Sequence, residues 1–461
     1  MVDWAWGLCL CLTAIITVTA QQTGQHSDWP RWCGTVYQPR YPHFDPGGQT
    51  LPPTPAPGAP LLHVQSQPRY SLYLDSEQYD EFIVNAGMSK TPSVNTTGGL
   101  FRFPLTLLKP ALSPIRVVIY GAPKNGTPTF FTVATTLLYL LYKPTGSVTR
   151  IDNLHGCLYF SSSLINPTFA PFFPYGFYAS HDNFLRLNDT SVIDAYSALG
   201  FNAMTPLTTF DDSSYIVTYL STSAQRRLLR FMYSLREGYK NLSYVRANIL
   251  AAHDAPAGLF AYWSADEPDG WQEEPFLSPQ QAYGTIRAVD PYRPVSCNAT
   301  YGECVCDNCE GTVWDVTVVF NPQSFHGEGY WLGDPSVEES LIMVSLAVND
   351  GAKGVISWVW PTSEVLAVAH GRSAGMLAGN EVVGFVVVDA AGWAVAGKML
   401  VSVVNGGYVD IEGGVTVLVP NATIIESTPW GSVRWKLEAG KLSVPLLPAL
   451  ATNLVIMDLG G

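Results

Sequence analysis

The spacing of hydrophobic and polar residues changes along this chain, and the positions of these changes indicate domain boundaries. Residues 61–160 contain short β-type runs, such as 116–120 and 130–136, separated by Gly, Pro and Asn, which is typical of a small β-sandwich. From about residue 170, apolar strand-like runs alternate with helical segments. Repeated β-α units of this kind predict a parallel sheet or barrel. From about residue 382 onward the chain is again β-rich, which predicts a terminal β-sandwich.

The central part predicts a (β/α)8-type barrel, although its strand count is short. We expect strands at 172–180, 201–205, 228–235, 259–265, 316–320 and 354–360. We expect helices at 192–199, 215–221, 242–252, 278–289 and 337–348, with Ser278 as an N-cap and Pro279 in the first turn. A fifth strand starts at Pro294, but a cysteine cluster follows at once. Either the barrel is incomplete and open on one side, or the sequence has lost segments there.

These patterns divide the chain into five parts. They are a signal peptide at 1–20, a Pro-rich leader at 21–60, an N-terminal β-sandwich at 61–165, a (β/α)-barrel catalytic-type domain at 166–380 and a C-terminal β-sandwich at 381–461. The first part is largely apolar from Trp4 to Thr19, with small residues before Gln21. It indicates a secretory signal cleaved after Ala20 and hence a secreted, extracellular protein. A membrane anchor is the alternative, but the run is short for a span.

Composition supports a folded exported protein. Of 461 residues, 47% are hydrophobic and only 14% are charged, so the chain can bury a large core. The net charge of −13 argues against a nucleic-acid partner, because no basic stripe is present to bind phosphates. No phosphate-binding Gly loop and no His-Glu-Xaa-Xaa-His helix is present, and we expect no cofactor and no metal.

The number of cysteines and the Asn-Xaa-Ser/Thr glycosylation sequences (sequons) are typical of an exported protein. Six cysteines follow the signal segment: Cys33, Cys157, Cys297, Cys304, Cys306 and Cys309. An even number in an exported chain implies disulfides, with two bridges inside the 297–309 cluster and one between Cys33 and Cys157. A zinc site in the cluster is the alternative. Sequons predict glycosylated surface positions at Asn95, Asn125, Asn188, Asn241, Asn298 and Asn421.

The strongest chemical signal lies at the end of the strand predicted at 259–265. This apolar run ends in the adjacent carboxylates Asp266 and Glu267, which Pro268 and then Trp271 follow. Acidic residues at the carboxyl end of a barrel strand lie where barrel enzymes perform their chemistry, and aromatic rings suit the apolar faces of a sugar. The pattern therefore favours a carbohydrate-active enzyme. The alternative is a plain strand followed by an acidic Pro-Gly turn.

Six segments carry a family resemblance. Residues 153–156, 173–178, 199–202, 265–271, 351–354 and 426–431 together resemble a group of little-characterised secreted fungal proteins that look like clan-A-type glycoside hydrolases. The resemblance runs from about residue 60 to the C-terminus. It implies a (β/α)-barrel between β-domains, with more chain near residues 296 and 311 than this sequence has.

Glycoside cleavage needs a proton donor and a second group that stabilises the oxocarbenium-like centre. We expect Glu267 to be the general acid/base. The second group is either Glu328, acting as the nucleophile of a retaining enzyme, or Asp266, orienting a 2-acetamido group of the substrate. Aromatic residues are expected to contact an oligo- or polysaccharide substrate: Tyr175, Trp263, Trp271, Trp358 and Trp360. His326 is a weaker candidate.

The sequence therefore favours a secreted, retaining glycoside hydrolase that cleaves O-glycosidic bonds, with no nucleic-acid partner and no membrane association after signal cleavage. The alternative is a catalytically inactive carbohydrate-binding or cell-wall protein on the same scaffold.

Overall fold

The computed structural model of the chain describes a set of separated segments. They are residues 31–32, 35–36, 62–88, 96–121, 131–163, 166–187, 189–207, 229–236, 238–253, 257–266, 277–298, 319–326, 333–349, 352–377, 389–395, 397–405, 410–419, 422–431 and 433–459. The chain divides into two compact units. The first unit is His43–Val319, and the second unit is Met1–Pro42 together with Phe320–Gly461. The predicted signal peptide lies outside the described residues.

The N-terminal part of the first unit is built from antiparallel strands, as the short β-type runs predict. One sheet contains β3 (Leu62–Pro68), β5 (Tyr79–Met88) and β6 (Thr96–Pro104), and a hairpin pairs β7 (Ile115–Gly121) with β8 (Phe131–Leu138). The short strands β4 (Tyr73–Leu74) and β9 (Leu140–Leu141) pair in parallel. Another sheet contains β10 (Ser147–Asp152), β11 (Cys157–Ser162) and β12 (Asn166–Phe172). The 3-10 turn η3 (Leu105–Leu107) follows β6, and Leu105 packs with Tyr73, Leu138 and Leu140.

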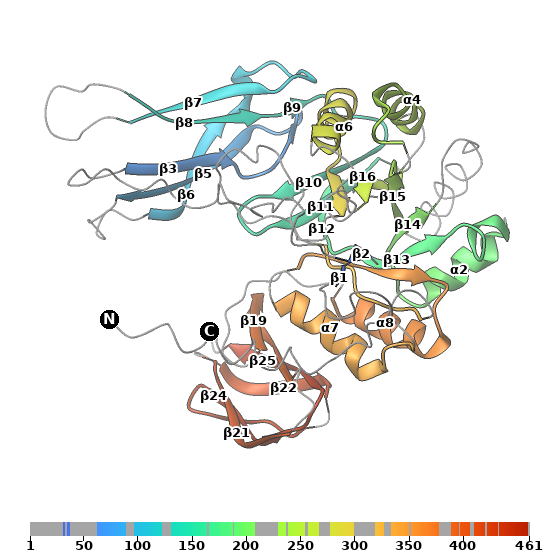
Figure 1. The fold of residues 1–461 in the computed structure, drawn as a ribbon. Coiled ribbons are helices and arrows are strands. Elements are labelled where there is room, and N and C mark those ends of the chain that lie inside the picture. The colour runs from blue at the N-terminus through green and yellow to red at the C-terminus, as the bar shows by residue number, and fades with distance from the viewer. Residues whose placement is uncertain are drawn as a thin grey trace, which may run out of the picture. The chain divides into compact units, whose positions relative to one another are not determined.

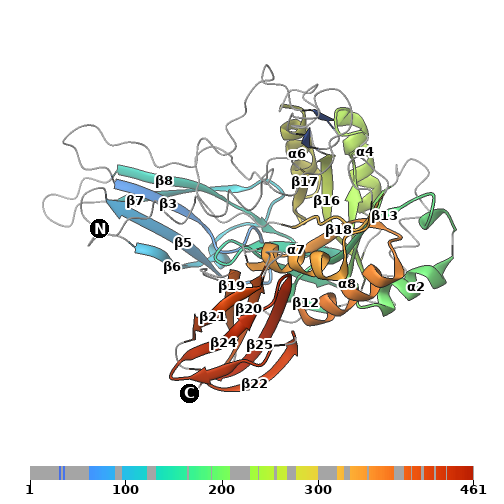
Figure 2. The same cartoon turned by 60° about the horizontal axis from the view of Figure 1, so that its bottom comes forward.

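A parallel sheet follows in the same unit. Its strands pair in chain order: β13 (Tyr175–Ser180), β14 (Ala203–Leu207), β15 (Arg230–Ser234), β16 (Leu259–Asp266) and β17 (Val295–Asn298). Strands β13 to β16 lie side by side in Figure 1, and β17 lies beside β16 in Figure 2. The helices between them are α2 (Thr190–Ala198), α4 (Leu242–His253) and α6 (Leu277–Val289), with a 3-10 turn η4 (Leu185–Leu187) before α2. α4 and α6 contact each other, and α6 contacts β16 and β17. Burial of both faces explains why β16 begins with the apolar run 259–263 and does not alternate with polar residues there.

The structure corrects several expectations about this sheet. The strand expected at 172–180 is confirmed from Tyr175 to Ser180, but Phe172 ends the antiparallel strand β12, and Phe173 and Pro174 separate it from the parallel strand β13. Helix α6 already begins at Leu277, so Ser278 is not its N-cap. Within the described residues, β17 has no partner beyond β16 and the parallel strands do not close into a barrel. The helix expected at 215–221 lies outside the described residues.

The second unit combines helices with a β-rich C-terminal part. It contains the short hairpin β1 (Arg31–Trp32) and β2 (Thr35–Val36), helix α7 (Val337–Asn349), strand β18 (Val355–Trp360) and helix α8 (Glu364–Leu377). Of the strand expected at 316–320, the structure describes only Val319 and Phe320, and Phe320 forms a parallel bridge with Val355. Helix α8 was not among the elements expected from the sequence.

The C-terminal strands form two sheets, which lie together in Figure 2. One contains β19 (Asp389–Val395), β20 (Lys398–Asn405), β25 (Ala451–Leu459) and β22 (Ala422–Trp430). The other contains β21 (Ile411–Leu418), β24 (Lys441–Leu447) and β23 (Lys436–Glu438). Their shared core includes Val403, Val415, Leu442 and Val455. None of the described helices combines the length and the hydrophobicity that a bilayer crossing requires.

Candidate functional site

One face of the parallel sheet carries the predicted acidic strand end. Strand register pairs Tyr178 of β13 with Thr205 of β14, and Ser234 of β15 with Trp263 of β16. Paired residues of neighbouring strands project from the same face, and the Tyr178 ring meets the Trp263 ring edge-on, with centroids 4.8 Å apart. These four side chains therefore share one face of the sheet, called here the Trp263 face.

A β-bulge near the end of β16 decides which side chain points to this face. The register with β17 shifts between Trp263 and Ala265, and a bulge interrupts the alternation of side chains. Ala265 packs against Ala282 of α6 and against Tyr239, so it lies on the helix-covered face. Asp266 then returns to the Trp263 face.

Contacts of Arg236 support this placement of Asp266. Arg236 follows β15, and its Nη1 lies 3.3 Å from Oδ2 of Asp266. Its Cζ lies 5.4 Å from the centroid of the Trp263 ring, within the range of a cation–π contact. Both members of the ion pair are partly exposed, Arg236 at 23% and Asp266 at 31%. A charged pair thus lies beside Trp263 at the carboxyl edge of the sheet.

Two of the aromatic residues expected to contact a sugar lie in the core. Trp263 is fully buried on the face that bears its name. Tyr175 is also fully buried, but its ring stacks on Phe201 with centroids 6.4 Å apart. Strand alternation places Tyr175 on the opposite face from Tyr178. In this structure Tyr175 therefore packs against Phe201, on the opposite face of the sheet from Asp266.

Several expected site residues lie outside the described residues, so their roles stay predictions: Glu267, Trp271, Glu328, Cys33, Cys304, Cys306, Cys309, Asn95, Asn125, Asn188 and Asn421. The backbones of Cys297 and Asn298 belong to β17, but their side chains are not described. Asn241 is exposed directly before α4 and its side chain accepts a hydrogen bond from the amide of Tyr244. Sγ of Cys157 lies 3.6 Å from the carbonyl oxygen of His155.

The second unit holds Trp358 and Trp360, both partly exposed in β18. Gln323 and Trp358 form a parallel bridge, and the amide of Ser324 donates to the carbonyl oxygen of Trp358. His326 is exposed and its Nδ1 lies 2.9 Å from Asp334. Trp358 and Trp360 therefore retain surface that a ligand can contact.

A buried histidine in the same unit is structural. Nε2 of His370 lies 3.0 Å from Oγ of Ser324 and 2.8 Å from Oγ of Ser340. Burial lowers the pKa of His370 to about 4, so the ring is neutral at ordinary pH and links these two hydroxyls. All three residues are buried, which leaves no room for a substrate between them.

A nucleophile-elbow sequence pattern also occurs in this unit. Residues 371–375 match Gly-Xaa-Ser-Xaa-Gly, but they lie inside α8 and not at a strand-to-helix turn. The buried Ser373 donates to the carbonyl oxygen of Ala369 at 3.2 Å. The pattern is therefore no esterase nucleophile.

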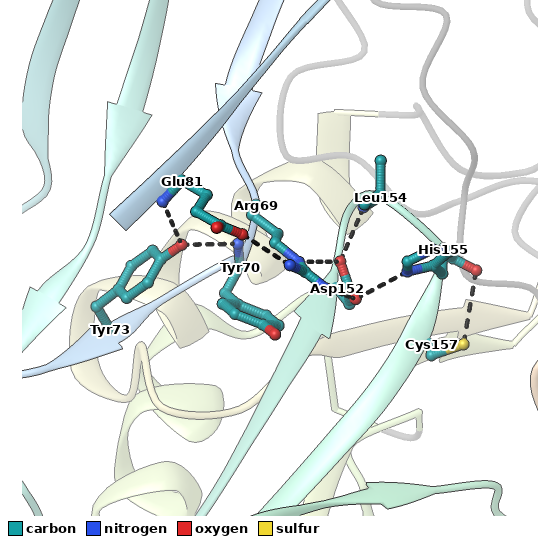
Figure 3. Close-up of polar contacts among 8 residues, drawn as sticks. All are labelled: Arg69, Tyr70, Tyr73, Glu81, Asp152, Leu154, His155 and Cys157. Carbon is teal, nitrogen blue, oxygen red and sulfur yellow. Dashed lines mark hydrogen bonds and ion pairs between the residues drawn. The ribbon is translucent and has the colours of Figure 1, made fainter. Parts of the chain in front are cut away.

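The resemblance segment 153–156 forms part of a polar network in the first unit (Figure 3). The carboxylate of Asp152, which is almost fully buried, contacts Nε and Nη2 of Arg69 at 3.4 Å each and Nδ1 of His155 at 3.1 Å, and it accepts from the amide of Leu154. Arg69 also donates to Glu81 at 2.7 Å. Burial lowers the pKa of Arg69, but hydrogen bonds to Glu81 and Asp152 outweigh it and raise the pKa overall. This network fixes the turn between β10 and β11 against β5.

Sequence reasoning did not identify Arg236, Thr205 or Ser234. Their proximity to Trp263 depends on strand register, which no local pattern records. The described residues contain no group of three or more His, Cys, Asp and Glu side chains placed to hold a metal ion.

Comparison with known proteins gives distant structural similarity only. No family model and no curated protein matches the chain. A glycoside hydrolase family 30 subfamily 8 xylanase from Clostridium acetobutylicum is 10% identical, with 62% of this chain and 96% of that chain covered and a TM-score of 0.42. A GH30 endoxylanase from Clostridium papyrosolvens is also 10% identical, with 62% and 97% covered and a TM-score of 0.39. An α-fucosidase from Thermotoga maritima is 13% identical, with 58% and 78% covered and a TM-score of 0.36. Similarity this distant assigns neither family nor activity.

Proposed function

We propose that the chain is a glycoside hydrolase that cleaves O-glycosidic bonds by carboxylate acid/base catalysis, with Glu267 as the general acid/base. The observation that carries the proposal is the Arg236–Asp266 ion pair beside Trp263 at the carboxyl edge of a parallel sheet. Carboxylates at this edge are where α/β-sheet and barrel enzymes perform their chemistry. Glu267 follows Asp266 directly in the chain.

The mechanism assigns different roles to the two adjacent carboxylates. Nη1 of Arg236 contacts the Asp266 carboxylate at 3.3 Å, an ion pair at the strand end. A neighbouring anion favours the protonated form of Glu267, which is the form that a general acid needs. In the retaining version Glu328 is the nucleophile that forms the covalent glycosyl-enzyme intermediate.

Substrate assistance through Asp266 is the less favoured route. In that route the Asp266 carboxylate orients the substrate's 2-acetamido group, but in this structure the carboxylate contacts Arg236. Faster turnover of aryl N-acetylhexosaminides than of the plain hexosides would favour the assisted route.

A non-catalytic carbohydrate-binding protein is the second candidate, and one observation favours it. The described parallel strands do not close into a barrel, and β17 has no further strand partner among them. An open sheet places fewer strand ends around a reacting bond than a closed barrel does.

Leaving-group dependence tests the proposal. The full chain and its Glu267→Gln variant are compared on aryl glycosides of several neutral sugars, each with a poor (phenyl) and a good (2,4-dinitrophenyl) leaving group. Loss of the general acid should lower kcat/KM about 10²–10⁴-fold for the phenyl glycosides. The dinitrophenyl glycosides should be far less affected, because their leaving group departs without a proton.

The control is Glu438→Gln, which changes an exposed carboxylate on β23 and should leave all rates unchanged. Equal rates for the wild type and Glu267→Gln on the phenyl glycosides would remove Glu267 from its assigned role. Sugar binding with no hydrolysis of any substrate would favour the non-catalytic candidate.

A further inference from the structure

Three buried hydrogen-bonding groups on the Trp263 face have no partner. They are Oγ1 of Thr205, Oγ of Ser234 and Nε1 of Trp263, for which the described structure provides no hydrogen bond. Thr205 and Trp263 are 0% exposed and Ser234 is 3% exposed. Most buried polar side-chain atoms in folded proteins are hydrogen-bonded, so three exceptions on adjacent strands require an explanation.

The three groups lie on the same face of three neighbouring strands, β14, β15 and β16, and two of them lie beside the Arg236–Asp266 pair. Ser234 and Trp263 are register partners on β15 and β16. Thr205 lies on β14 beside Tyr178, whose ring contacts Trp263. Arg236 lies over Trp263 and holds Asp266. Together they line one side of the sheet immediately below the acidic strand end.

Unpaired buried polar groups destabilise the folded protein, because each has lost its hydrogen bonds to water without forming one within the protein. Apolar residues of the same shape would remove this cost: Val for Thr205 and Ala for Ser234. Polar groups placed where they reduce stability are typical of binding sites, in which a ligand supplies the missing partners.

We propose that Thr205, Ser234 and Trp263 bind the hydroxyl groups of one neutral sugar unit below the Arg236–Asp266 pair. The inference rests on the proposed glycoside hydrolase function and specifies its substrate contacts. Two hydroxyls can donate or accept, and the indole N–H can donate, which matches the alternating donors and acceptors of a sugar. None of the three carries a charge, so a neutral sugar fits better than a uronic acid. Because the groups are buried, the side chains that cover them must move when the sugar binds.

The test combines stability with binding in the full chain. Thr205→Val and Ser234→Ala are made singly, and each thermal midpoint is compared with that of the wild type. Both variants should be as stable as the wild type or more stable, because each removes an unpaired group. Ser264→Ala is the matched control, since Oγ of Ser264 donates to the carbonyl oxygen of Ser296 at 3.0 Å and is equally buried. This control should lower the midpoint.

Binding is measured in the Glu267→Gln background, which prevents turnover, by calorimetry with methyl glycosides of glucose, galactose, mannose, xylose, fucose and N-acetylglucosamine. Methyl glucuronide serves as the charged comparator. Each substitution should weaken binding of the best neutral probe about threefold to tenfold, as expected for one hydrogen bond. The charged comparator should bind more weakly than the neutral glucoside.

Three results would overturn the inference. A lower midpoint for Thr205→Val would mean that its hydroxyl is already paired in the folded protein, for example through a buried water. Unchanged affinity in both variants would mean that the sugar binds elsewhere. Failure of every neutral probe to bind would remove the sugar site. The two proposals can fail separately. If Glu267→Gln abolishes hydrolysis while Thr205→Val and Ser234→Ala leave sugar affinity unchanged, this inference is rejected and the proposed function is retained.

Discussion

Asp80 is a carboxyl group that the fold places in an unfavourable position. It is the second residue of β5 and is 0% exposed. Burial raises the pKa of Asp80 to about 7, and the nearby Glu77 and Glu81 carboxylates add to the increase. The group is therefore protonated in the folded chain at mildly acidic pH, whereas in the unfolded chain it is ionised above its ordinary pKa. A raised folded-state pKa makes the folded state bind more protons between pH 4 and 7, so stability falls as pH rises through this range.

We predict that Asp80→Asn stabilises the chain at pH 7.5. The variant removes a buried charge, and the shift in pKa corresponds to a gain on the order of 4 kcal/mol in the free energy of unfolding. Near pH 4 the gain should vanish, because the wild-type group is then neutral as well. Urea denaturation at both pH values measures the difference. Asp75→Asn, which changes an exposed neighbour, should have little effect at either pH, and a loss of stability in Asp80→Asn at pH 7.5 would contradict the prediction.

At the scale of elements, a buried ionic network fixes the turn between α6 and β17. The carboxylate of Asp290 contacts the guanidinium of Arg293 and the hydroxyl of Tyr262. Oγ of Ser147, from β10, lies 3.2 Å from Nη2 of Arg293 and donates to the carbonyl oxygen of Leu259. All four side chains are buried. The network therefore joins an antiparallel strand of the N-terminal part to β16, the strand that ends at Asp266.

We predict that Asp290→Ala destabilises the chain by about 3–5 kcal/mol, because it leaves the Arg293 guanidinium buried without its counter-charge. The double variant Asp290→Leu/Arg293→Met should be less destabilised than the single one, since both charges are removed. Urea denaturation measures both. Asp182→Ala disrupts an exposed pair with Arg186 and should cost less than about 1 kcal/mol. A double variant that is less stable than the single one would argue against this account.

The sequence predicted the secondary-structure elements better than the contacts between side chains of different strands. Long periodic segments gave β16, α4, α6 and α7 within about two residues of their observed bounds. Helix α8 was missed, because its 364–377 sequence contains two glycines and an apolar run without clear helical periodicity. The position of Asp266 at a strand end could be predicted locally. Arg236, Thr205 and Ser234 could not, since their contact with Trp263 arises from register and from the bulge after Trp263, which depend on three strands at once.

At the scale of the whole molecule, the two units respond to acid in opposite ways. Asp80 belongs to His43–Val319, and His370 belongs to the unit that contains Phe320–Gly461. Burial lowers the pKa of His370 to about 4, so the folded state binds fewer protons than the unfolded state between pH 4 and 6.5. Stability from this group is complete above pH 6.5 and is lost as pH falls toward 4. Over the same range, protonation of Asp80 stabilises the other unit.

We therefore predict opposite shifts in local stability when pH falls from 7.5 to 5. Hydrogen exchange, corrected for the intrinsic rate at each pH, should show stronger protection in β5 and weaker protection in α8, each by about 2 kcal/mol in opening free energy. Asp80→Asn should abolish the change in β5 and leave that in α8, because each group titrates within its own unit. If both segments instead shift in the same direction by the same amount, the units unfold as one, and stability at each pH reflects the sum of the two groups.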